Sequence, residues 1–280
     1  MTRKELVNHI FEKESFLCVG LDPDIKKIPE SIQGTPAQRI LAFNKAIIDA
    51  TAPFCVAFKP NVAFYECHGA DGWDALAQTV AYIRSNYPDQ FIIADAKRGD
   101  IGNTAARYAA TFFENMDCDA VTLAPYMGED SVKPFLAYKD RWSIILALTS
   151  NPSADDFELV QDIKGVPLYQ RVIRMSRHWG SPVNTMYVVG ATRPEALDAI
   201  RELAPRNFLL VPGVGAQGGN LDDVMAHGLI DECGLLVNSS RGIIHASGSD
   251  DFAAAAAEAA RSMAAKMSEG LRKYLADENM

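Results

Sequence analysis

Short apolar runs rich in valine, isoleucine and leucine alternate along the chain with longer amphipathic segments. Most of the short runs are continuously apolar, a pattern typical of parallel strands that are covered on both faces. They predict eight strands, at Phe16–Asp22, Cys55–Lys59, Phe91–Ala96, Ala120–Ala124, Ser143–Thr149, Met186–Gly190, Phe208–Pro212 and Gly234–Asn238.

The intervening segments carry helical patterns. The first predicted helix, Pro36–Ala50, follows Thr35 as an N-cap and begins with proline, whose fixed φ suits the first helical position. The others are predicted at Asp71–Tyr87, Gly102–Met116, Gly128–Tyr138, Gly165–Trp179, Pro194–Leu203, Leu221–Ala226 and the alanine-rich Asp251–Ala276. Eight strand-then-helix units without a break in composition predict an α/β fold, a single (β/α)8 TIM barrel in one domain over residues 1–280. A doubly wound open sheet is the alternative.

Charged residues gather where the second and third predicted strands end. Lys59 ends one apolar run, and Asp95, Lys97, Arg98 and Asp100 follow another. Residues two apart on a strand share a face, and neighbouring strands lie about 4.8 Å apart, so Lys59, Asp95 and Lys97 are expected to converge. A structural ion pair at a sheet end would give the same pattern. Because so many charges are unfavourable to desolvate, we prefer a charged catalytic array.

A glycine-rich segment, Pro212–Gly219, follows the seventh predicted strand, and Asn238–Gly242, which includes Arg241, follows the eighth. Glycines let backbone N–H groups approach an anion, and Arg241, followed by Gly242, offers a bidentate fork for phosphate oxygens. Gln217 adds a neutral amide donor. Loops after these two strands are the usual phosphate site of such barrels, so they predict a phosphate site here. Glycines that only end helices are the plainer alternative.

Two other strand ends carry polar residues. Asp22 ends the first predicted strand, where its carboxylate can accept hydrogen bonds from sugar hydroxyls. Ser150 follows the fifth strand, where its hydroxyl and an adjacent backbone N–H can read the polar edge of a heterocycle. Both lie in sequences that also favour simple turns.

The remaining composition narrows the class of protein. A net charge of -9 disfavours nucleic-acid and anionic-membrane partners. The five cysteines and five histidines show no metal-ligand spacing, and no dinucleotide or P-loop fingerprint is present. The N-terminus lacks the apolar core of a signal peptide, and no apolar run is long enough to span a membrane. We therefore expect a cytoplasmic enzyme with no cofactor and no metal.

With these residues in view, the chain resembles the orotidine 5′-phosphate decarboxylase family, in its longer bacterial (type 2) branch, over nearly its whole length. The resemblance rests on Asp95-x-Lys97-x-x-Asp100 with the following Ile101-Gly102-Asn103-Thr104, on Lys59, and on the loops predicted to bind phosphate after the seventh and eighth strands. It implies conversion of orotidine 5′-monophosphate to uridine 5′-monophosphate and CO2, in de novo pyrimidine biosynthesis, without a cofactor.

The resemblance also implies roles for individual residues. Lys59, Asp95, Lys97 and Asp100 would form an alternating charge array, with Lys97 as proton donor to C6 of the pyrimidine and Asp95 beside the departing CO2. Asp22 would bind a ribose hydroxyl and Ser150 the pyrimidine edge, with Gln217 and Arg241 on the phosphate. A homodimer is implied, in which Asp100, Ile101 and Thr104 enter the neighbouring subunit's site.

Three alternatives stay open. A metal-dependent sugar-phosphate decarboxylase of the same superfamily shares the D-x-K-x-x-D strand, but relatives of that kind carry an acidic ligand where this chain has Lys59, which would repel Mg²⁺. A Schiff-base aldolase using Lys59 or Lys97 needs a neutral amine, which the neighbouring carboxylates oppose. A non-catalytic sensor of phosphate ligands would be expected to lose the catalytic charges.

Overall fold

The computed structural model describes residues 1–193, 195–214 and 218–278. Within them, eight parallel strands follow one another in chain order around a closed barrel, and the last pairs with the first. The strands are β1 (Leu17–Leu21), β2 (Ala57–Pro60), β3 (Phe91–Arg98), β4 (Ala120–Leu123), β5 (Trp142–Leu148), β6 (Thr185–Val189), β7 (Phe208–Pro212) and β8 (Leu235–Ser239). The α/β prediction of a (β/α)8 TIM barrel is confirmed.

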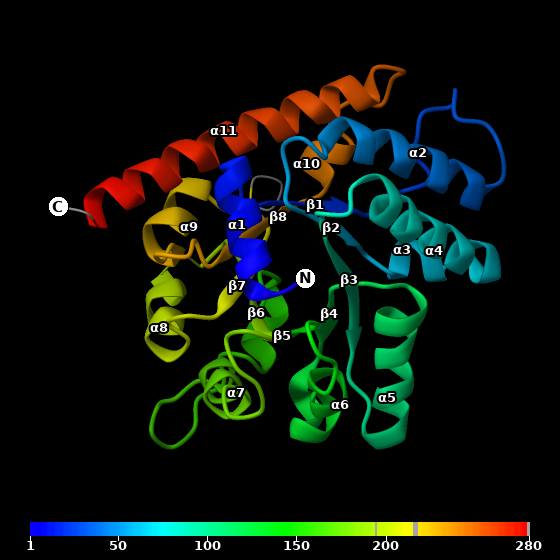
Figure 1. Cartoon of the computed structure of the whole chain (residues 1–280). Coiled ribbons are helices and arrows are strands. Elements are labelled where there is room, and N and C mark those ends of the chain that lie inside the picture. The colour runs from blue at the N-terminus through cyan, green and yellow to red at the C-terminus, as the bar shows by residue number, and fades with distance from the viewer. Residues whose placement is uncertain (194, 215–217, 279–280) are drawn as a thin grey trace.

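Helices surround the strands, as Figure 1 shows from the end of the barrel that α1 covers. The described helices are α1 (Arg3–Lys13), α2 (Pro36–Thr51), α3 (Ala63–Glu66), α4 (Gly69–Asn86), α5 (Gly102–Ala110), α6 (Lys133–Leu136), α7 (Leu168–Ser176), α8 (Glu195–Leu203), α9 (Leu221–Gly228), α10 (Arg241–Ile244) and α11 (Phe252–Glu278). Because helices cover the outside and side chains fill the inside, β1, β2, β4, β6 and β8 are buried at every position.

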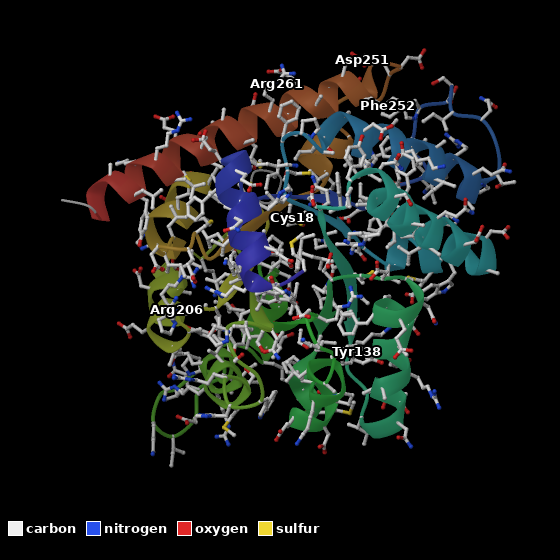
Figure 2. The ribbon with its side chains drawn as sticks, viewed as in Figure 1. Cys18, Tyr138, Arg206, Asp251, Phe252 and Arg261 are labelled. Carbon is white, nitrogen blue, oxygen red and sulfur yellow. The ribbon has the colours of Figure 1, made fainter. Side chains whose placement is uncertain are left out.

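Local sequence explains where α1, α2 and α9 begin, because a side chain caps each of them. The predicted N-cap of α2 is confirmed, since Thr35 and Gln38 form a capping box. The alanine-rich α11 packs on α2, and Phe252, labelled in Figure 2, stacks on Phe43 at 5.2 Å between ring centroids. The predicted helix over 128–138 is wrong in extent, because two 3₁₀ turns lead into a short α6. Pro194, where another helix was predicted to begin, lies outside the described residues.

Aromatic rings fill the end of the barrel where the strands begin. Phe91, Trp142 and Phe208 are the first residues of β3, β5 and β7. Trp142 meets the other two rings edge to face, at 6.1 and 6.2 Å between centroids. Side chains from alternate strands therefore form one layer of the barrel core, as this architecture requires.

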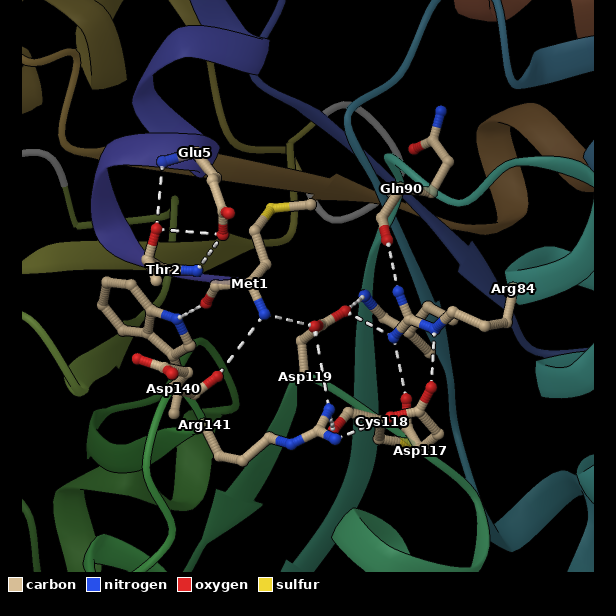
Figure 3. A network of polar contacts seen from close by, with 12 residues as sticks. Met1, Thr2, Glu5, Arg84, Gln90, Asp117, Cys118, Asp119, Asp140 and Arg141 are labelled. Atoms are coloured by element: carbon tan, nitrogen blue, oxygen red, sulfur yellow. Dashed lines mark hydrogen bonds and ion pairs between the residues drawn. The ribbon is translucent and has the colours of Figure 1, made fainter.

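A polar network lies outside that layer (Figure 3). The buried carboxylate of Asp119 accepts hydrogen bonds from the ammonium of Met1 at 2.8 Å, from Arg84 at 2.8 Å and from the N–H of Ile92 at 2.9 Å. Arg141 adds a hydrogen bond to Cys118 O at 2.8 Å. This network links Met1, just before α1, with α4 and the loops before β4 and β5. Ion pairs and hydrogen bonds therefore connect these segments at the end of the barrel where the strands begin.

The four buried cysteines, Cys18, Cys55, Cys118 and Cys233, act as apolar side chains. Cys18 of β1 lies inside the barrel (Figure 2), and burial raises the pKa of its thiol to about 12. Among the described residues, no group of histidine, cysteine and acidic side chains has the geometry to hold a metal ion. None of the helices in that part of the chain combines the length and hydropathy that a bilayer span requires.

Candidate active site

A polar pocket of about 280 Å³ opens at the carboxyl ends of the strands. This is the end of a (β/α)8 barrel at which active sites are built. Six residues that were predicted as site residues, from the ends of five strands, line this one pocket: Asp22, Lys59, Asp95, Lys97, Ser150 and Arg241. Segments up to 219 residues apart in the sequence therefore supply one site.

Two lysines converge on one carboxylate in the pocket. Lys59 Nζ lies 2.8 Å from Asp95 Oδ2, and Lys97 Nζ lies 2.6 Å from Oδ1. Lys59 and Asp95 are buried, whereas the side chain of Lys97 is 50% exposed. The predicted convergence of these three residues is confirmed. The ammonium of Lys59 is thus buried against the carboxylate, whereas that of Lys97 faces the open pocket.

Electrostatics keep the buried pair ionised. Burial by itself lowers the pKa of Lys59, but the carboxylates of Asp95 and Asp22 outweigh it and hold that pKa above its usual range. Burial raises the pKa of Asp95, but the two ammonium groups outweigh it and hold that pKa well below its usual range. Each charge therefore stabilises the other in a place where neither could remain ionised alone.

The backbone of β3 is irregular at Lys97. The register between β3 and β4 shifts between Ala94 and Arg98, and Lys97 has a φ of +46°. Its N–H donates to Thr122 Oγ1 at 2.9 Å, and the same hydroxyl donates to Asp95 Oδ1 at 2.9 Å. A left-handed backbone at a non-glycine residue costs about 1–2 kcal/mol, which these contacts and their neighbours must offset. Simple strand alternation does not describe this segment.

Arg98 anchors the other side of the irregularity. Its guanidinium pairs with Glu66 and donates to Ala96 O at 2.9 Å. It also lies over the rings of Tyr108 and Phe112, at 5.2 and 5.6 Å from their centroids. Arg98 therefore points toward α5 while Lys97 points into the pocket, so adjacent cations have separate surroundings.

Asp22 offers an acceptor to the pocket. It follows β1, and its Oδ1 is buried without a hydrogen-bond partner among the described residues. Buried carboxylate oxygens in folded proteins are almost always paired. This oxygen is therefore placed to accept a hydrogen bond from a hydroxyl group of a ligand.

The predicted phosphate end is described only in part. Arg241 begins α10 beside β8 and lines the pocket, whereas Gly242 is exposed on the same short helix. A Cβ at Gly242 would meet Ser239 Oγ at 3.6 Å, an ordinary contact, so sterics do not require glycine there. Gln217 lies outside the described residues.

Asp100, Ile101 and Thr104 do not line this pocket in the described structure. Asp100 follows β3 and accepts a hydrogen bond from the N–H of Ile101 at 2.8 Å. Ile101 is 50% exposed and Thr104 is exposed on the first turn of α5. One chain thus joins Lys59, Asp95 and Lys97 but not Asp100, and the predicted contribution of Asp100 to a neighbouring site stays a prediction.

Several pocket residues were missed by the sequence reasoning. Thr122 of β4 is the most important, because it contacts both Asp95 and the backbone of Lys97. Asn61 and Asn238 also line the pocket. Asn61 and Asn238 lie near the ends of apolar strands, the same signal that identified Lys59, whereas Thr122 is a lone polar residue inside the apolar β4.

A family model described as "Orotidine 5'-phosphate decarboxylase / HUMPS family" matches residues 15–259 of the chain. The chain belongs to this family. The family predicted from the sequence is thereby confirmed. Other members of the orotidine 5′-phosphate decarboxylase / HUMPS family are similar over almost the full length of the chain, as two curated relatives and one solved structure show.

A protein of Phocaeicola vulgatus named orotidine 5′-phosphate decarboxylase is 57% identical over 267 residues, covering 95% of this chain and 98% of that protein. One of Bacteroides fragilis with the same name is 56% identical over 275 residues, covering 98% of this chain and all of that protein (100%). The solved structure of Leishmania donovani OMP decarboxylase superposes with a TM-score of 0.83 at 33% identity, covering 96% of this chain and 98% of that one.

Proposed function

We propose that the chain decarboxylates orotidine 5′-monophosphate to uridine 5′-monophosphate, as a cytoplasmic enzyme of pyrimidine biosynthesis that needs no cofactor. The observation that carries the proposal is the placement of Lys59 and Lys97 on the two oxygens of Asp95 at the strand ends. The naming of relatives at 56–57% identity as orotidine 5′-phosphate decarboxylases supports it.

Loss of CO2 from the pyrimidine breaks the bond between C6 and the carboxylate and leaves its electron pair on C6. That pair lies in the plane of the ring and has no conjugated sink. An ammonium held in place where the negative charge develops stabilises it without reorganisation. Lys97 is such a group, because its Nζ is fixed by Asp95 at 2.6 Å and its side chain is 50% exposed toward the pocket.

Lys97 also completes the reaction. Its Nζ gives a proton to C6, which takes the electron pair, and the neutral amine then regains a proton from solvent. Asp95 would lie beside the substrate carboxylate, kept ionised by both lysines. Lys59 holds Asp95 from below and reaches the ribose, and Thr122 fixes the orientation of the carboxylate.

The rest of the pocket suits a nucleoside monophosphate. The unpartnered Oδ1 of Asp22 would accept a ribose hydroxyl. Ser150 would read the pyrimidine edge, and Arg241 would bind the phosphate together with Gln217. Asp22, Ser150 and Arg241 line the pocket from the ends of β1, β5 and β8, so the base, sugar and phosphate each have a predicted contact.

A homodimer would complete the charge array. Asp100, Ile101 and Thr104 lie on the segment that leaves β3, away from their own pocket and accessible to a second copy. The 50% exposed Ile101 is an apolar side chain that such a contact would bury. We expect Asp100 of one subunit to extend the Lys59–Asp95–Lys97 array of the other.

The test is the loss of orotidine 5′-monophosphate absorbance with purified protein in EDTA and without added cofactor. Rapid conversion to uridine 5′-monophosphate is expected. Activity that appeared only with Mg²⁺ and a ketose phosphate would instead assign the chain to the sugar-phosphate decarboxylases. The ammonium of Lys59, 2.8 Å from Asp95, disfavours that outcome because it stands where a cation would need to bind.

A further inference from the structure

We propose that Glu158 is a positioning residue for recognition of the pyrimidine: it fixes the loop Thr149–Asn151 so that Ser150 meets the edge of the base. Gly190 lies against Ser150 and, because it has no side chain, leaves room for it. This inference rests on the proposed function, and it assigns a role to the long connection between β5 and α7. The loop lines the pocket, whereas Glu158 stands behind it.

The carboxylate of Glu158 holds Thr149 at two atoms. Oε2 accepts the backbone N–H of Thr149 at 2.6 Å, and Oε1 lies 2.9 Å from its Oγ1. Hydrogen bonds from a backbone N–H to a carboxylate are shorter and stronger than those to neutral acceptors. Thr149 is the first residue after β5, so Glu158 fixes the direction in which the chain leaves the barrel.

The hydroxyl of Thr149 also contacts Asn151, on the other side of Ser150. Thr149 Oγ1 lies 2.6 Å from Asn151 Oδ1 as well as near Glu158. A hydroxyl has one proton, so it donates to one of these oxygens at a time. Glu158 therefore holds Thr149 through its N–H, while the hydroxyl of Thr149 donates either to Glu158 or to Asn151.

Glu158 is itself held in place by its backbone. Its N–H donates to Ala154 O at 2.8 Å, and its carbonyl accepts the N–H of Tyr169 at 2.9 Å near the start of α7. Ala154 and Tyr169 are both buried. The carboxylate therefore projects from a fixed point, unlike the exposed tip of the same connection, where Ile163 has no cover from the described chain.

Gly190 provides the second, independent constraint. It follows β6, and its N–H donates to Leu148 O at 2.8 Å. A Cβ at this position would lie 2.7 Å from Ser150 N and 2.8 Å from its Cα and Cβ. Real Cβ atoms do not approach other atoms so closely, so any side chain at residue 190 would displace Ser150.

Glu158 and Gly190 both fix the position of Ser150, which is proposed to recognise the edge of the pyrimidine. Displacing a recognition group by about 1 Å can lower a rate by about a hundredfold. The predicted phosphate contact, Arg241, begins α10 after β8, whereas the hydrogen bonds described for the Glu158 carboxylate go to Thr149. Loss of Glu158 should therefore impair reading of the base while leaving binding of the sugar phosphate intact.

The experiment compares two ligands that differ by the base. Glu158→Leu removes both acceptors, whereas Glu158→Gln keeps an amide oxygen for the Thr149 N–H. We expect Glu158→Leu to weaken binding of uridine 5′-monophosphate and to lower kcat/KM by about tenfold to a hundredfold. The Kd of ribose 5-phosphate should stay unchanged, and Glu158→Gln should restore most of the loss. Ile163→Ala, on the tip of the same connection, is the matched control and should resemble the wild type.

Two further variants make the test decisive. Gly190→Ala should show the same split between the two ligands, and it stands in for Glu158→Leu if that protein fails to fold. Combining Glu158→Leu with Ser150→Ala should lower kcat/KM little more than Ser150→Ala alone, because Glu158 acts on the base through the hydroxyl of Ser150. Equal weakening of both ligands, or full additivity, would overturn the positioning role. A wild-type protein that neither bound uridine 5′-monophosphate nor turned over the substrate would overturn the proposed function itself.

Discussion

Lys97 reaches Asp95 from a left-handed backbone: its Nζ lies 2.6 Å from Asp95 Oδ1 although its φ is +46°. The hydroxyl of Thr122 joins the two residues, since it accepts the N–H of Lys97 and donates to Asp95 Oδ1. One threonine thus orients a carboxylate and supports the irregular backbone that carries its partner.

Thr122→Val keeps the shape of the side chain and removes both hydrogen bonds. We expect kcat to fall by roughly tenfold and the free energy of unfolding by about 1–3 kcal/mol, because a buried N–H and a buried carboxylate each lose a partner. Steady-state kinetics and urea unfolding measure the two effects. Thr185→Val, in the buried start of β6, is the matched control and should lower stability without changing kcat.

Lys97→Ala removes both the ammonium that stabilises the developing charge and the proposed proton donor. We expect turnover to fall by at least about 10⁴-fold, the combined size of these two effects in other enzymes. The side chain is 50% exposed, so circular dichroism and the unfolding midpoint should change little. Binding of uridine 5′-monophosphate should persist. Turnover like that of the wild type would remove the proposed mechanism.

Asp95→Asn tests the buried pair. It leaves the ammonium of Lys59 buried beside a neutral amide, and breaking such a pair lowers the free energy of unfolding by about 3–5 kcal/mol. Lys59→Met, which removes the cation and keeps the bulk, leaves Asp95 with Lys97 and should cost less. Urea unfolding at neutral pH compares the two, and an equal loss would contradict the proposed pairing.

The same pair predicts how stability depends on pH. The folded-state pKa of Asp95 is lowered, so its contribution is full above the unfolded value of about 3.9 and is lost as the pH falls through the lower folded value. The pKa of Lys59 is raised, so its contribution is full below about 10.4 and is lost as the pH rises further. The unfolding free energy of the wild type should therefore fall below about pH 4, and that of Asp95→Asn should fall less because it lacks this carboxylate; urea unfolding at each pH measures both.

Arg241→Ala should act mainly on substrate affinity. Arg241 is exposed at the rim of the pocket, so its loss removes a phosphate contact without opening the core. We expect KM to rise by about tenfold to a hundredfold, the size of one or two charge-assisted hydrogen bonds. Arg206→Ala, on the outer surface in Figure 2, is the control and should leave KM unchanged. An unchanged KM for Arg241→Ala would place the phosphate elsewhere.

Asp119→Asn tests the opposite end of the barrel. Asp119 is buried and pairs with Arg84 and the ammonium of Met1 (Figure 3). Weakening this network should lower the free energy of unfolding by about 3–5 kcal/mol while kcat stays unchanged, because the network lies at the strand starts and the pocket at the strand ends. Kinetics and urea unfolding of the same preparation distinguish it from Asp95→Asn, which should lower both.

The parts of this molecule that could be predicted from sequence depend on short-range pattern. Continuous apolar runs mark strands covered on both faces, and the residue that ends each run marks the site. Lys59 and Asp95 were predicted to meet for that reason, since neighbouring strand ends lie at one face of the barrel. The motif around Asp95 also indicated the family, which the match over residues 15–259 confirms.

What sequence reasoning missed depends on how separate segments meet. The irregular backbone at Lys97 exists because Thr122 and Arg98 support it from two sides, and no local preference favours a left-handed lysine. Glu158 acts on Thr149 nine residues away through a loop whose path no periodicity describes. The helix α1 was overlooked because its apolar positions span only residues 6–11 between charged ends, although Thr2 and Glu5 form a capping box.

The strands that close the barrel, β1 and β8, are the first and the last to be synthesised. Leu17 of β1 pairs with Val237 of β8. The hydrogen bonds on this edge of β1 therefore cannot form until β8 has been synthesised. At about 5–20 residues per second, synthesis leaves that edge open for roughly 10 to 45 s. An unpaired strand edge invites pairing with other chains. A chain that ended before residue 235 would keep β1 and β7 as open edges, so it should aggregate more readily than the full chain.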